Sequence, residues 1–305
     1  MKFKSIAMAA AIATASLGTL LASPAAQAQA QEQFMPLLVY RTGQFAPMGI
    51  PWADGKQDYL KLVNAKGGVN GVKITFEECE TAYDTGKGVE CYERMKSRTG
   101  GTGSFDTQST GITFAVSDKA PGDKATIVTP GYGLSQSADG RVFEWNFPLL
   151  GNYWTAADSM IQDILKKEKG GLKSKKITLM DDGAPYGKEP RPLLEKRAAK
   201  EGFELLKLPV TAPGVEQKST WLQIRQQRPD YVLLWSAGVM TPTSIREAQA
   251  TAYPRDKIYG IWWAGSETDV QDIGAGAKGY NTVTIQNTAE FDKVHDEIKT
   301  MLYDK

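Results

Sequence analysis

The feature that most constrains the fold is an alternation of short apolar segments with longer amphipathic segments along the second half of the chain. The apolar segments lie at residues 176–180, 204–208, 231–235 and 258–263. The stretches between them repeat apolar residues at helical spacing, at 193–199, at 221–224 and at 245–250. Strand–helix units of this length, repeated in series, predict an α/β fold whose parallel sheets are flanked by helices.

The first half shows the same alternation with one weak element. Strands are expected at 37–40, 72–76 and 125–128, with helices between them. Where another apolar strand is required, the chain is Gly-rich and offers Phe105 as its large apolar residue. Residues 142–148 alternate and end at a proline, which predicts an extended segment leaving the first lobe. The later part predicts a helix at 153–168, a strand at 280–285 and an amphipathic helix at 289–303.

The first thirty residues have the pattern of a secretory signal. Lys2 and Lys4 precede an apolar run that extends to Leu21, and Ala-Gln-Ala sites follow at residues 26–28 and 28–30. The run is too short for a membrane span and its flanks are those of a cleaved leader. No cysteine precedes Cys79, so a lipid anchor on an N-terminal cysteine is not expected. The sequence therefore predicts secretion, most simply into a bacterial periplasm.

The charge balance excludes several classes of partner. The formal net charge of +1 becomes −1 when Lys2 and Lys4 are removed with the leader. A chain without a basic excess has no field to hold nucleic acid or an anionic membrane surface.

Two cysteines, Cys79 and Cys91, are the whole cysteine content. In an oxidising compartment they are expected to form a disulfide that closes a short loop and contributes roughly 2–3 kcal/mol to stability. A reactive thiol is the less favoured alternative.

Two turns in the first half are candidates for one wall of a ligand site. Ser109 and Thr110 precede an apolar run, which is the signature of a helix N-terminus with unpaired N–H groups. Pro130-Gly131-Tyr132-Gly133 follows a predicted strand and lets backbone approach a ligand closely. An ordinary capped helix and an ordinary turn are the alternative interpretation.

Aromatic residues supply a second candidate wall. Tyr186 lies in a turn that directly follows a predicted strand, while Trp235 and the pair Trp262-Trp263 end two others. Carboxyl ends of parallel strands are where α/β proteins bind ligands. Because side chains alternate along a strand, at most one of Trp262 and Trp263 is expected to face ligand.

Catalytic chemistry has little support. His295 is the only histidine and lies among charged residues, which excludes His-based triads and His-rich metal sites. No nucleophile elbow of the G-x-S-x-G kind occurs. We therefore expect no enzyme, no cofactor and no metal.

Short segments in a fixed order carry a family resemblance. They are Gly67-Gly68-Val69-Asn70-Gly71-Val72-Lys73-Ile74, Ser109-Thr110-Gly111, Thr129-Pro130-Gly131, Tyr186-Gly187 and Pro229-Asp230-Tyr231-Val232. From about Leu37 onward the chain resembles the type I periplasmic binding proteins. More narrowly, it resembles the branched-chain amino acid (Leu/Ile/Val-type) substrate-binding proteins of ABC transporters.

The resemblance implies two Rossmann-like lobes that close on a small-molecule ligand and present it to permease subunits. It implies a signal peptide at 1–30, a first lobe at 31–150 plus 280–305, a second lobe at 151–279, and a monomer. The ligand contacts that it implies, together with the aromatic residues above, give one set of candidates: Phe45, Met48, Ser109, Thr110, Gly131, Tyr132, Gly133, Tyr186, Trp235 and Trp263.

Two departures from the family pattern bear on the ligand. Gly133 stands where amino-acid binders often carry a threonine, and Trp262-Trp263-Ala264 stands where they place an acid that pairs with the ligand ammonium. A buried ammonium without a counter-charge is costly. The expected ligand is therefore an amino acid or, more readily, an aromatic or other small organic acid or amide held by Ser109 and Thr110.

The resemblance also implies a longer chain, with a third crossover beyond Lys305. A chain ending there is expected to expose apolar surface and to be less stable than a longer relative. A sensory receptor of the same fold is the alternative function, and a secreted enzyme is the alternative class.

Overall fold

The computed structural model describes residues 32–98, 102–285 and 292–304. The predicted signal peptide, part of the Gly-rich stretch and the beginning of the predicted last helix lie outside these residues. No helix in the described ranges is long and apolar enough to span a membrane.

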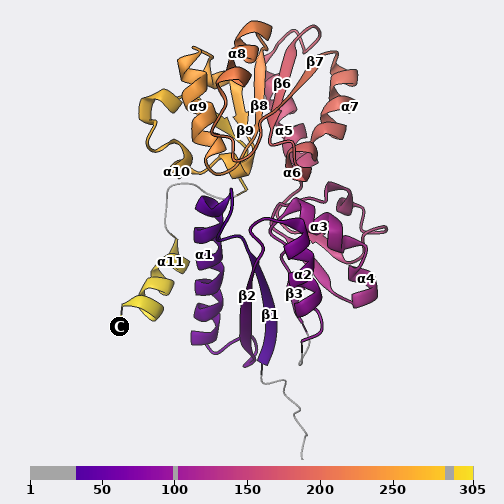
Figure 1. The fold of residues 1–305 in the computed structure, drawn as a ribbon, viewed down its shortest axis with the longest axis vertical. Helices are drawn as coiled ribbons and strands as arrows, with labels where there is room; N and C mark the ends of the chain where they lie inside the picture. The colour runs from indigo at the N-terminus through magenta and orange to yellow at the C-terminus, as the bar shows by residue number, and fades with distance from the viewer. Residues whose placement is uncertain (1–31, 99–101, 286–291, 305) are drawn as a thin grey trace, which may run out of the picture. The chain divides into compact units, whose positions relative to one another are not determined.

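The second half contains a five-stranded parallel sheet in the order β10-β9-β8-β6-β7 (Figure 1). Its strands are β6 (Lys176–Asp181), β7 (Glu204–Pro209), β8 (Tyr231–Trp235), β9 (Ile258–Gly260) and β10 (Asn281–Thr282). Its helices are α5 (Tyr153–Lys167), α6 (Pro185–Lys188), α7 (Arg191–Glu201), α8 (Lys218–Gln227), α9 (Met240–Ala250) and α10 (Glu267–Val270). Short 3-10 segments are η2 (Arg255–Lys257), η3 (Trp262–Ala264) and η4 (Gly274–Ala277).

Side-chain alternation explains how this sheet is covered. Along β8, Tyr231, Leu233 and Trp235 pack with α5 and α7, whereas Val232 and Leu234 pack with α8 and α9. Every residue of β8 is buried, as expected for a parallel strand with helices on both faces. The predicted α/β architecture with helix-flanked parallel sheets is confirmed.

The first half contains two smaller parallel sheets, β1-β2 and β3-β4-β5. The strands are β1 (Glu32–Val39), β2 (Lys73–Glu80), β3 (Ser104–Phe105), β4 (Thr126–Thr129) and β5 (Asn146–Pro148). The helices are α1 (Ala46–Ala65), α2 (Thr85–Met95), α3 (Thr110–Ser117), α4 (Ala120–Asp123) and the 3-10 segment η1 (Ser135–Ala138). Isolated parallel bridges at Phe34–Thr102 and Leu37–Asp106 join β1 to the β3 side.

The two halves therefore share one strand order. In the first half it is β2-β1-β3-β4-β5 when the isolated bridges are included, and in the second it is β7-β6-β8-β9-β10. In each half the order reverses beside the first strand, at β1/β3 and at β6/β8. Ligands in open α/β sheets bind outside the carboxyl ends of the strands at such a switch point.

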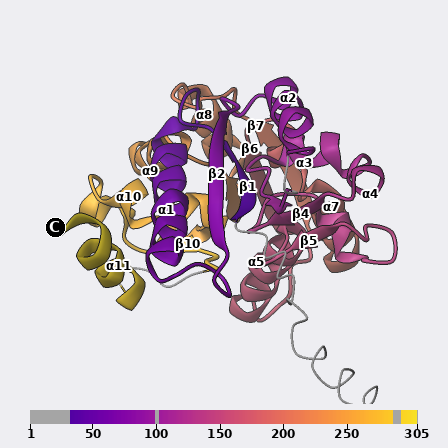
Figure 2. The same cartoon turned by 90° about the horizontal axis from the view of Figure 1, so that it is seen from below.

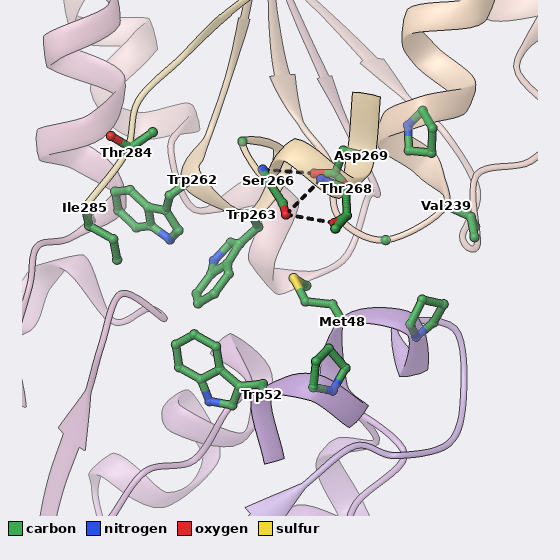
Figure 3. A pocket seen from close by; sticks show the side chains of 15 residues that line it. Met48, Trp52, Val239, Trp262, Trp263, Ser266, Thr268, Asp269, Thr284 and Ile285 are labelled. Carbon is green, nitrogen blue, oxygen red and sulfur yellow. Dashed lines mark hydrogen bonds between the residues drawn. The ribbon is translucent and has the colours of Figure 1, made fainter. Parts of the chain in front are cut away.

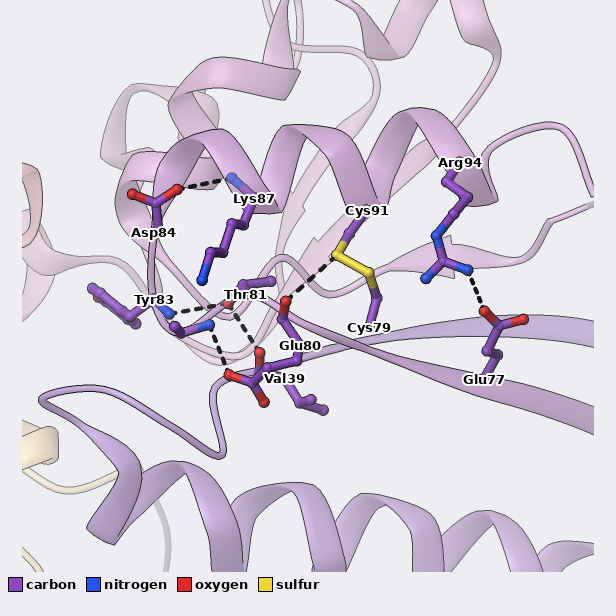
Figure 4. The surroundings of a disulfide bond; sticks show 11 residues. Val39, Glu77, Cys79, Glu80, Thr81, Tyr83, Asp84, Lys87, Cys91 and Arg94 are labelled. Atoms are coloured by element: carbon purple, nitrogen blue, oxygen red, sulfur yellow. Dashed lines mark hydrogen bonds and ion pairs between the residues drawn. A yellow bond between two sulfur atoms is a disulfide. The ribbon is translucent and has the colours of Figure 1, made fainter.

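The disulfide between Cys79 and Cys91 links the end of β2 to α2 (Figure 4). The Cys91 sulfur lies 4.0 Å from the backbone carbonyl oxygen of Glu80, and Arg94 on the same helix pairs with Glu77 on the same strand. Half-buried β2 is thus tied to the helix that covers it.

Three predicted segments differ from the structure. Residues 142–145 form turns in which the N–H groups of Val142 and Phe143 donate to the Asp139 carbonyl, so only β5 is extended. The strand predicted at 258–263 ends at Gly260, because residues 262–264 form the 3-10 segment η3. Of the predicted strand at 280–285, only β10 pairs, and its partner is β9.

The end of the described chain returns to the first half. Helix α11 (Lys293–Ile298) and the π-helical turn η5 (Lys299–Tyr303) lie beside α1 (Figure 2). The Tyr303 hydroxyl donates to Asp58 on α1 at 2.7 Å, and Lys66 pairs with Glu297.

Candidate ligand-binding site

A cavity of about 510 Å³ lies between α1 of the first half and the carboxyl ends of β8 and β9 (Figure 3). Its size is that of a pocket for a small organic molecule. Its lining comes from both halves: Pro47, Met48, Pro51, Trp52, Gly238, Val239, Pro242, Trp262, Trp263, Gly265, Ser266, Thr268, Asp269, Thr284 and Ile285.

Both Trp262 and Trp263 line this cavity, so the premise that they alternate along a strand is wrong, and the expectation that at most one of them meets ligand stays a prediction. The alternation rule does not apply to them, because they lie in the 3-10 segment η3 and not in a strand. Two hydrogen bonds hold this turn: Ala264 N donates to Ile261 O at 2.7 Å, and the Tyr280 hydroxyl donates to Ala264 O at 2.8 Å. The two indole rings meet edge to face, with centroids 6.4 Å apart.

Trp52 contributes a third indole and was not among the predicted site residues. Its ring meets that of Trp263 edge to face at 5.6 Å. A signal was available in the sequence, since Trp52 follows the predicted Met48 by four residues and one helical turn places both on the same face.

Asp269 is the one ionisable side chain among the lining residues, all of which the structure describes. It occupies the third position of α10, where its Oδ2 accepts from Ser266 N at 3.2 Å in a capping box. Burial raises the pKa of the Asp269 carboxyl to about 7. The Ser266-x-x-Asp269 spacing is a helix-start signature that sequence analysis could have found.

Five predicted residues surround a smaller void of about 10 Å³: Phe45, Met48, Tyr132, Tyr186 and Trp263. This is the space of about one water molecule. The Tyr132 hydroxyl lies 3.0 Å from the Tyr40 hydroxyl, and the Tyr186 hydroxyl donates to Ser236 O at 2.9 Å. Burial raises the pKa values of Tyr132 and Tyr186 well above the usual 10.0, so these hydroxyls remain protonated partners.

Ser109 and Thr110 begin α3 as predicted, but they line neither cavity. The Ser109 hydroxyl accepts from Ile112 N at 3.4 Å, and the Thr110 hydroxyl accepts from Gly133 N at 3.2 Å. A Cβ atom on Gly133 would lie 2.6 Å from the Thr110 methyl group, so a larger residue at position 133 would require the Thr110 side chain to shift.

Gly131 and Trp235 also lie outside the linings of both cavities. Gly131 (φ +148°) lies against the Trp262 ring, which a Cβ atom would approach to 3.1 Å. Trp235 is buried against Tyr153, with ring centroids 5.9 Å apart. The indole N–H groups of Trp235 and Trp262 are buried without a partner among the described residues.

Asp182, in the turn after β6, is a second carboxyl whose pKa is raised. Its Oδ1 accepts from Ala184 N at 3.0 Å and Gly187 N at 3.1 Å, while its Oδ2 is buried without a partner in the described part of the chain. Burial raises the pKa of Asp182 to about 6. Its neighbour Asp181 is paired with Arg191 at 2.7 Å.

The described residues contain no group of three His, Cys, Asp or Glu side chains placed to hold a metal ion. What they offer is a mostly apolar cavity between two α/β halves, with three tryptophans among its lining residues. This combination defines a ligand-binding protein of the two-lobed α/β class.

Comparison with known proteins agrees with that class. The family model described as "Periplasmic binding protein" matches residues 32–300, and the chain belongs to this family. A protein described as an ABC transporter permease from the Pseudomonas fluorescens group has a similar structure, with 38% sequence identity and a TM-score of 0.76. The match covers 90% of this chain and 68% of that one.

Two more distant structures share the fold. A branched-chain amino acid ABC transporter protein from Thermus thermophilus with bound valine has 17% identity and a TM-score of 0.78, over 88% of this chain and 70% of that one. An ABC transporter solute-binding protein from R. palustris in complex with benzoate has 18% identity and a TM-score of 0.67, over 89% and 74%. The search of curated proteins finds no match.

Proposed function

We propose that this chain is the periplasmic substrate-binding component of an ABC importer for a small organic molecule. The observation that carries the proposal is the cavity of about 510 Å³, because its walls come from both halves at the carboxyl ends of their strands. The predicted range of ligands, from amino acids to small organic acids and amides, fits a cavity of that size. Relatives of the same fold hold valine and benzoate.

The remaining sequence expectations belong to the same proposal. Residues 1–30 act as a signal peptide, the mature protein acts as a monomer in the periplasm, and its partners are permease subunits. The proposed first lobe is 31–150 plus 280–305 and the proposed second lobe is 151–279. The contacts of α11 with α1 support the return to the first lobe, whereas the pairing of Asn281 and Thr282 with β9 favours a second lobe that extends through β10. N-terminal sequencing of the protein recovered from a periplasmic extract should begin at Gln29 or Gln31, and an uncleaved Met1 would contradict the leader.

A thermal unfolding screen tests the binding function. A ligand at a hundred times its dissociation constant should add about 2.7 kcal/mol to the free energy of unfolding and shift the melting temperature by several degrees. The panel should contain amino acids, aromatic acids, amides and amines, and the Trp263→Phe variant should lose part of any shift. A cooperative melt that no compound shifts would contradict the proposal.

A further inference from the structure

The cavity lining can carry only negative charge. Asp269 is its ionisable residue, and the other polar side chains, Ser266, Thr268 and Thr284, are neutral. None of the lining residues is Lys, Arg or His. An anionic ligand would therefore enter without a cationic side chain to pair with, at a cost that increases with desolvation.

A hydrogen bond fixes the Asp269 carboxyl, but no cationic side chain among the described residues neutralises its charge. Its hydrogen-bond partner is the Ser266 N–H, and within the described ranges it forms no ion pair. The neighbouring titratable group is Tyr280, whose hydroxyl is already directed to Ala264 O. Burial already raises the pKa of this carboxyl, so a cation beside it would relieve an existing desolvation cost.

Three indoles form walls at steep angles around the same space. The rings of Trp52 and Trp263 are inclined at 75°, and those of Trp262 and Trp263 at 74°. Each ring of the pair is backed by a tyrosine: Tyr153 stacks on Trp262 at 5.3 Å and Tyr132 on Trp263 at 4.8 Å. Indole faces attract cations through their quadrupole, and walls that are already fixed lose little entropy on binding.

We propose that the ligand of this cavity carries a positively charged nitrogen, held against the indoles of Trp52, Trp262 and Trp263 and paired with the Asp269 carboxylate. The inference rests on the proposed binding function, and among small organic ligands it favours organic ammonium compounds over the acids and amides that the sequence predicts. Asp269 would then supply the counter-charge to a ligand ammonium that Trp262-Trp263-Ala264 does not supply.

Three probes of matched size separate the charge classes: benzylamine, benzamide and benzoate. Isothermal titration calorimetry on the purified protein should show benzylamine, as its ammonium ion, binding roughly tenfold more tightly than the other two. Asp269→Asn keeps an acceptor for Ser266 N and should weaken benzylamine about tenfold while leaving benzamide unchanged. Exposed Asp272 is three residues away and outside the lining, so Asp272→Asn is the matched control.

Trp52→Leu provides a second variant in case Asp269→Asn fails to fold, and it should also weaken benzylamine selectively. Preferential binding of benzoate or benzamide would overturn the cationic assignment and leave the binding function standing. Equal losses of benzylamine affinity in Asp269→Asn and Asp272→Asn would overturn the role of Asp269. If none of the three probes binds, the cationic assignment fails, and the wider thermal screen decides separately whether the chain is a receptor.

Discussion

Trp263 separates two very different spaces: the void of about 10 Å³ beside Tyr132 and Tyr186, and the cavity of about 510 Å³ beside Trp52 and Asp269. Both are lined by aromatic side chains. On the small side the hydroxyls pair with each other or with backbone, as Tyr132 does with Tyr40. On the large side the chain leaves the sheet at Gly260, and the turn that follows directs both tryptophans toward open space.

The difference shows why one cluster of aromatic side chains lines an open cavity while the other packs as closed core. Rings whose polar atoms find partners nearby can close on one another at no further cost. At Trp262 and Trp263 the backbone has turned away from the sheet. A tyrosine stacks on one face of each indole ring, and the rings also line the large cavity.

Trp263→Ala should have the largest effect, because this side chain belongs to both spaces. It removes the stacking with Tyr132 and the hydrogen bond from Nε1 to the Tyr153 hydroxyl at 2.8 Å, and it joins the void to the cavity. We expect the free energy of unfolding to fall by about 3–5 kcal/mol in urea denaturation. Trp154→Phe, outside both linings, is the control, and an equal loss in both variants would show that Trp263 does not divide the two spaces.

Asp182→Asn should have the next largest effect, with the opposite sign. The folded pKa of Asp182, about 6, lies above the ordinary value of 3.8, so between about pH 4 and pH 6 the folded state binds more protons than the unfolded state. The free energy of unfolding contributed by this group therefore falls as the pH rises through that window, and the loss persists at pH 7. Removing the charge should restore about 2–3 kcal/mol at pH 7 and nothing at pH 3.

Denaturant titrations of wild type and Asp182→Asn at pH 3, 5 and 7 measure this difference. Asp181→Asn is the contrasting variant, because Asp181 is paired with Arg191 and its loss should destabilise the protein. An Asp182 variant that is less stable than wild type at pH 7 would mean that its hydrogen bonds to Ala184 and Gly187 outweigh the burial cost.

Gly131→Ala tests how closely the first half meets the tryptophan pair. The added Cβ would lie 3.1 Å from the Trp262 ring, and the φ of +148° is a conformation that alanine rarely adopts. We expect a loss of about 1–3 kcal/mol together with a changed tryptophan fluorescence spectrum. Gly122→Ala is the matched control, since nothing lies within 4 Å of its added atom. Identical spectra for Gly131→Ala and wild type would show that Trp262 does not rest on this turn.

The sequence predicted most of the fold but only part of the site. β8 has the bounds that its apolar run predicted, because a fully buried parallel strand needs no information from distant residues. The end of β9 was missed, since it depends on the Tyr280 hydroxyl reaching Ala264 from sixteen residues away. That contact is one of the two hydrogen bonds that hold the turn carrying Trp262 and Trp263, and no local sequence pattern contains it.

The predicted site residues were likewise only partly placed at the large cavity. Met48 and Trp263 line the large cavity, whereas Phe45, Tyr132 and Tyr186 lie around the small void. Ser109 satisfies the N–H group of Ile112 within its own helix, which is the ordinary capping role that the sequence left open. Whether these residues contact ligand stays a prediction.

The smallest expected effect concerns the hydroxyl pair that closes the small side. Tyr132→Phe and Tyr40→Phe each remove one end of the 3.0 Å hydrogen bond and should each cost about 0.5–1.5 kcal/mol. Each single change leaves one buried hydroxyl unpaired. The double variant should therefore have a free energy of unfolding at least as high as that of the less stable single variant. A double-mutant cycle in urea measures that coupling. Additive losses would mean that the two hydroxyls have other partners, such as a water in the void, and the small side would then be a polar extension of the ligand cavity and not closed core.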